Sequence, residues 1–92
     1  MSVVPRWLEL TQEIDCLYFL LEEERRHLPR SPIDKAVDTA TGADVARARR
    51  CREIAIEMKK LKAEWSKETG READTEMEDA ILAVTEQTEP TP

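Results

Sequence analysis

The sequence predicts an all-α protein, an antiparallel helical hairpin of coiled-coil type with a short connecting helix and a short C-terminal helix. Of the 92 residues 37% are charged, 40% are hydrophobic and only two are glycine, a mixture typical of long helices. Two long segments repeat apolar residues at alternating steps of three and four. We expect one domain over residues 1–86, with helices at about 5–28, 32–39, 42–69 and 72–85, and a disordered acidic, proline-containing tail at 87–92.

The first helix is predicted by a stripe of seven positions, six of which are apolar. Pro5 suits the first turn of this helix, and Pro29 together with Pro32 ends it. The stripe covers about three heptads and would form one side of a helix–helix seam. Its members are Trp7, Leu10, Ile14, Leu17, Leu21, Glu24 and Leu28.

Helix-capping patterns predict the next two helix starts. In "SPID" Ser31 can cap a helix whose first residue is Pro32, and in "TGAD" Thr41 stands in the capping position of a long helix. Gly70 is placed to end that long helix in the left-handed conformation. The connecting helix between them is expected to end at about Thr39.

A second stripe supports an antiparallel pairing of the two long helices. In one register Trp7 meets Trp65, and the polar break at Glu24 falls opposite Arg47, a residue of opposite charge. The sequence therefore predicts a Glu24–Arg47 ion pair at the hairpin end. The second stripe consists of Cys51, Ile54, Met58, Leu61 and Trp65.

Large apolar residues of the first helix lie outside its seam and need another cover. The segment "TEMEDAILAV" forms a short helix, with Thr75 and Glu78 as its capping box, but it is too short to cover them all. Surplus apolar surface on a small protein is typical of an interface, and a homodimer is its simplest cover. The candidate partner interface is Leu8, Tyr18, Phe19 and Leu20.

Charge is divided unequally along the chain. Residues 1–67 carry a net charge of +1, whereas residues 68–92 carry −7 and so supply the excess of acid. The acidic segment is a candidate partner-facing surface or a solubility device. Its candidate acidic face is Glu72, Asp74, Glu76, Glu78 and Asp79.

Arginines gather at the predicted hairpin end, around the motif "RARRCR". Such a patch can bind phosphate or nucleic acid, although no aromatic residue lies among the arginines to stack on a base. Neighbouring acids favour intramolecular and intersubunit ion pairs instead. The candidate anion-binding patch is Arg25, Arg26, Arg47, Arg49, Arg50 and Arg52.

Residues for catalysis or for cofactor and metal binding are scarce. His27 is the single histidine, at a helix end where it complements the dipole. Cys16 and Cys51 are expected to be reduced core thiols; the alternative for Cys51 is a thiol acidified by the flanking arginines. We expect no enzyme activity, no cofactor and no metal.

A thirteen-residue stretch, "EIDCLYFLLEEER", resembles the first helix of the all-helical chorismate mutases. In that family an arginine three positions before the isoleucine binds substrate, and here that position is Thr11. The resemblance therefore implies no mutase site in this chain.

The function expected from the sequence is that of a small acidic protein-interaction module. It would act as an adaptor, assembly factor or inhibitor that binds and occludes a partner protein through a helical face. Two alternatives are open: an acidic nucleic-acid mimic of the phage-inhibitor type, and a binder of anionic ligands or nucleic acid at the basic end. No apolar run approaches the ~20 residues of a membrane span, and no signal-peptide pattern is seen, so a cytoplasmic location is expected.

Overall fold

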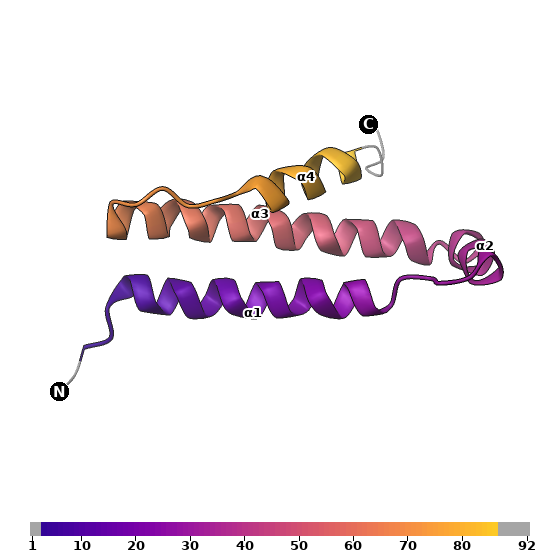
Figure 1. The fold of residues 1–92 in the computed structure, drawn as a ribbon, viewed down its shortest axis with the longest axis horizontal. Helices are drawn as coiled ribbons and strands as arrows, with labels where there is room; N and C mark the ends of the chain where they lie inside the picture. Colours follow the sequence, from indigo (N-terminus) through magenta and orange to yellow (C-terminus); the bar gives the residue numbers. More distant parts are fainter. Residues whose placement is uncertain (1–2, 87–92) are drawn as a thin grey trace.

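The computed structural model describes residues 3–86, and these residues form four helices and no strand (Figure 1). The helices are α1 (Arg6–Arg26), α2 (Pro32–Ala40), α3 (Ala43–Thr69) and α4 (Glu76–Thr85). The all-α class predicted from the sequence is confirmed for this part of the chain. The tail expected to be disordered, 87–92, lies outside the described residues.

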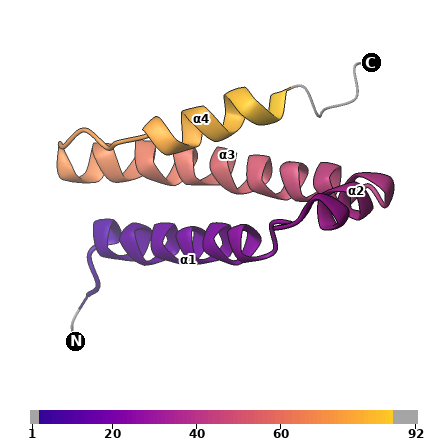
Figure 2. The same ribbon diagram turned by 45° about the vertical axis from the view of Figure 1, so that its right-hand side comes forward.

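Helices α1 and α3 lie side by side and run in opposite directions, with α2 across the end where they are joined (Figure 1). Helix α4 packs on α3, and α3 lies between α1 and α4 in both views (Figure 2). The molecule is long and thin, with extents of 55 × 30 × 20 Å. No helix of residues 3–86 has the length and apolar character that a membrane crossing requires.

The core is a single layer of side chains between the paired helices. Among residues 3–86 four apolar residues are buried, and three of them, Leu10, Ile14 and Met58, belong to the stripes read from the sequence. The fourth, Ala55, lies beside the second stripe. At the open end of the pair Trp7 remains 44% exposed, and it lines a shallow depression together with Trp65, as the predicted register requires.

Two predicted helix caps are confirmed. The Ser31 hydroxyl accepts a hydrogen bond from the Asp34 amide at 3.1 Å, and Pro32 is the first residue of α2. At the other end of α3 Gly70 has φ +69°, and its N–H donates to the Ser66 carbonyl at 2.9 Å. A side chain at this left-handed position would be strained, which explains the glycine.

Two other capping predictions are wrong. Thr41 does not cap α3; its hydroxyl donates to the Val37 carbonyl at 2.9 Å and so completes the end of α2, while Gly42 (φ +76°) leads into α3. Thr75 and Glu78 do not form a capping box either. The side chain of Glu78 is turned toward α3, and the Asp74 carboxylate accepts from the Glu76 amide at 2.9 Å at the start of α4.

Candidate interaction surfaces

The outer face of α1, defined by Leu8, Cys16, Phe19 and Leu20, is directed away from α3. Phe19 follows the buried Leu10 by nine residues, which is two and a half turns and hence the opposite side of the helix. Phe19 is 61% exposed and Leu20 47%, whereas Leu8 is half-buried. Helix α4 lies beyond α3 and leaves this face uncovered (Figure 1).

Tyr18, predicted as part of the same interface, has a different place. Its phenol oxygen accepts a hydrogen bond from the Lys62 ammonium at 2.8 Å, and the ammonium lies 5.0 Å from the centre of the ring. Tyr18 is therefore turned toward the junction of α1, α3 and α4. The structure brings Phe19 and Leu20 together on the outer face and separates Tyr18 from them.

Lys62 is the centre of a buried polar cluster that the sequence did not reveal. Besides Tyr18, its ammonium donates to Glu78 Oε1 at 2.6 Å and to the Asp74 carbonyl at 2.7 Å. The Lys62 side chain is 9% exposed and that of Glu78 is fully buried. Burial would lower the pKa of Lys62, but the hydrogen bonds to Glu78 and Tyr18 outweigh it and the pKa is raised.

A sequence signal for this cluster exists in retrospect. Lys62 follows Ala55 by seven residues and Met58 by four, so it shares their side of α3. A lysine on that side either reaches solvent or meets a carboxylate. Nothing in the local pattern of α4 distinguished Glu78 from its neighbouring acids.

The predicted acidic face is consequently smaller than its sequence suggests. Glu78 is buried against Lys62, and Asp79 accepts a hydrogen bond from the Lys59 ammonium at 2.6 Å, which lowers the pKa of Asp79. Asp79 stays exposed in this pair, and the other three predicted members are exposed as well. They are Glu72, Asp74 and Glu76.

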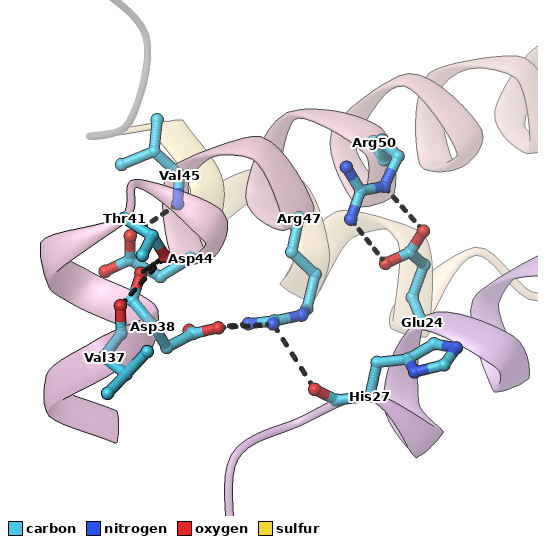
Figure 3. A network of polar contacts seen from close by, with 9 residues as sticks. All are labelled: Glu24, His27, Val37, Asp38, Thr41, Asp44, Val45, Arg47 and Arg50. Carbon is cyan, nitrogen blue, oxygen red and sulfur yellow. Dashed lines mark hydrogen bonds and ion pairs between the residues drawn. The ribbon is translucent and has the colours of Figure 1, made fainter. Parts of the chain in front are cut away.

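The arginines of the basic end are engaged in intramolecular pairs. Both terminal nitrogens of Arg47 donate to the Asp38 carboxylate of α2, at 2.9 and 2.7 Å, and one also reaches the His27 carbonyl at 3.4 Å (Figure 3). Arg50 donates to both oxygens of Glu24, at 2.7 and 3.1 Å. These hydrogen bonds lower the pKa of Asp38 and of Glu24.

The predicted Glu24–Arg47 ion pair is therefore wrong, because Arg47 pairs with Asp38 and Glu24 pairs with Arg50. The two residues are close enough for the Arg47 charge to favour the ionised form of Glu24. Asp38 nevertheless holds Arg47, because α2 brings this carboxylate across the hairpin end (Figure 3). Arg50, one turn further along α3, is left to bind Glu24.

The remaining arginines of the patch have similar partners. Arg26 lies 3.0 Å from Glu23, Arg25 lies 3.9 Å from Glu22, and Arg52 donates to the Leu82 carbonyl at 3.1 Å. Among the described residues Arg49 forms no ion pair. The structure thus brings the predicted patch together but compensates most of its charge.

The two thiols differ from one another. Cys16 is exposed on the outer face of α1, so its predicted place in the core is wrong; the stripe that faces α3 passes through Ile14 and Leu17 instead. Cys51 is partly buried, and this burial raises its pKa despite the nearby arginines. The raised pKa argues against an acidified Cys51. Within residues 3–86 no group of three potential ligands could hold a metal ion.

Comparisons of the chain with protein-family models, with curated proteins and with solved structures found no match.

Proposed function

We propose that this protein is a helical interaction module that binds a partner protein through the outer face of α1 and forms a homodimer on its own. As an adaptor, assembly factor or inhibitor, it would act by covering the surface to which it binds. The observation that carries the proposal is the position of Phe19 and Leu20, two large apolar side chains on a face that no other described helix covers.

The accessible surface of the chain supports association. The surface measures 7026 Å², whereas a compact monomer of 10.6 kDa exposes about 5,500 Å². The excess is on the order of 1,500 Å². A stable interface of standard size removes about 800 Å² from each partner. A dimer can therefore bury a full interface and still expose as much surface per chain as a compact protein.

The shape supports the same proposal. The radius of gyration is 16.2 Å, against about 12 Å for a compact chain of this length. Helix α4 lies along the side of α3 that faces away from α1, so no described helix packs on the side of α1 away from α3 (Figure 2). Packing two copies along the outer face of α1 would add a second layer of buried side chains on the side of α1 that faces away from the seam, in the manner of a helical bundle.

The alternatives receive less support from the arrangement of charges. A nucleic-acid site at the basic end would need free arginines, but Arg47 and Arg50 are bound to carboxylates. An acidic mimic of nucleic acid would need a row of exposed acids, and Glu78 is removed from that row by burial. We therefore place the partner-binding function on the outer face of α1.

The proposal is tested by measuring mass in solution with light scattering. The wild-type chain should have twice its 10.6 kDa monomer mass, and Phe19→Asp should be monomeric with unchanged helix content. Ile33→Asp is the matched control, because Ile33 is 77% exposed on α2 and lies away from α1. A folded Phe19→Asp variant that remained dimeric would refute the role of this face.

A further inference from the structure

A depression of about 300 Å³ lies between α1 and the segment that precedes α4, and the Lys62 cluster forms its edge. Ile14, Tyr18 and Trp65 supply apolar and aromatic surface, and three acidic residues also belong to the lining. We call it the Trp65 pocket. Its acidic members are Asp15, Glu72 and Asp74.

The carboxylates of the Trp65 pocket are uncompensated within the described residues. Asp15 and Glu72 make no ion pair there, and Asp74 Oδ1 accepts only from the Glu76 amide at the start of α4. Lys62, the one cation in the lining, has three N–H donors, and all are used by Tyr18, Glu78 and the Asp74 carbonyl. The pocket therefore combines negative charge with aromatic surface.

This combination selects for a cationic, flat group. A guanidinium stacks on aromatic rings and donates to carboxylates in a planar fork, whereas an ammonium is a compact, strongly hydrated charge. The volume is at the lower limit of small-molecule sites, so it suits one side chain better than a larger ligand. Four exposed acids at and after the end of α3 would also draw a basic segment toward this end of the molecule; they are Glu68, Glu72, Asp74 and Glu76.

We infer that the Trp65 pocket receives an arginine side chain from a basic segment of the partner protein. The inference rests on the proposed function and deepens it, because it gives the chemistry of the partner. The outer face of α1 would supply apolar contact area, and the pocket would supply selectivity for a basic partner.

The test uses the full chain and the peptide Ac-Gly-Arg-Gly-NH₂, followed by NMR of the two indole N–H groups. The Trp65 signal should shift saturably, and the Trp7 signal should move little. The same peptide with citrulline in place of arginine keeps the shape and removes the charge, and it should bind at least about tenfold more weakly. Equal shifts with both peptides, or an equal response of Trp7, would overturn the inference.

Matched variants separate the pocket from general attraction by charge. Asp15→Asn combined with Glu72→Gln should weaken binding of the arginine peptide by about fivefold or more. Glu53→Gln combined with Glu57→Gln removes the same charge from exposed positions of α3 that line no part of the pocket, and it should leave binding unchanged. If both double variants weakened peptide binding equally, the effect would come from net charge alone and the proposed site would be refuted.

Failure of this inference is distinguishable from failure of the proposed function. The mass of each sample is measured alongside the titration. One outcome would refute the pocket alone: the wild-type chain is a dimer, Phe19→Asp makes it monomeric, and the arginine peptide does not bind.

Discussion

The buried pair Lys62–Glu78 allows a quantitative prediction about how α4 is held on α3. Glu78→Leu would leave the ammonium of Lys62, whose side chain is 9% exposed, with only Tyr18 and the Asp74 carbonyl as partners. The lysine can then stay charged without its counter-ion or lose its proton, and the second option costs about 4–5 kcal/mol at pH 7 for an ordinary lysine. We expect a loss of about 3–5 kcal/mol in the free energy of unfolding, or detachment of α4 at a similar or lower cost.

Two further variants make this prediction specific to a buried pair. Replacing both partners, as Lys62→Met with Glu78→Leu, should restore stability to near the wild-type value or above it, because no charge remains buried. The control is the exposed ion pair Lys59–Asp79, which also joins α3 to α4 and lies about one turn from Lys62. Its variants are Lys59→Met alone and Lys59→Met with Asp79→Leu. The side chains of Lys59 and Asp79 are 41% and 54% exposed, so each change should lower the free energy of unfolding far less than Glu78→Leu does.

Urea unfolding followed by circular dichroism measures these values, and hydrogen exchange of the α4 amides reports its detachment. The raised pKa of Lys62 means that the contribution of this group is complete below its ordinary value of 10.5 and is lost as pH rises through the raised value. The measurements at pH 7 therefore compare fully formed pairs. A Glu78→Leu variant as stable as wild type, with unchanged exchange in α4, would show that the pair is not buried.

Two other properties follow from the structure. Arg50 lowers the pKa of Glu24 below its ordinary 4.5, so this contribution is complete above that value and is lost as pH falls through the lowered one; Glu24→Gln should flatten the acid side of the curve of Tm against pH, and an unchanged curve would contradict the pairing. In the monomeric Phe19→Asp background, a disulfide reagent should modify the exposed Cys16 at least about tenfold faster than the partly buried Cys51. Equal rates for the two thiols would show that Cys51 is as open as Cys16.

The sequence by itself determined the helices and most of their ends. Apolar spacing predicted which sides of α1 and α3 face each other, because a helix repeats its direction every three to four residues whatever surrounds it. Ser31 and Gly70 act on the backbone within one turn, so their roles could be read directly. The prediction that Thr41 caps α3 was wrong because this residue lies between two helix ends. Its hydroxyl bonds to the end of α2, which precedes it, and not to the start of α3.

The tertiary structure decided which charged side chains meet. Periodicity shows which side of a helix a residue occupies, but it does not show which element comes to cover that side. The register of α1 and α3 places Glu24 near Arg47, but Arg47 pairs with Asp38 because α2 lies across the hairpin end. Among the acids of α4, the side on which this helix packs against α3 placed Glu78 against Lys62 and left Glu76 in solvent. Local patterns fix helices through short-range bonds, whereas long, flexible charged side chains take the partners that packing brings within a few ångströms.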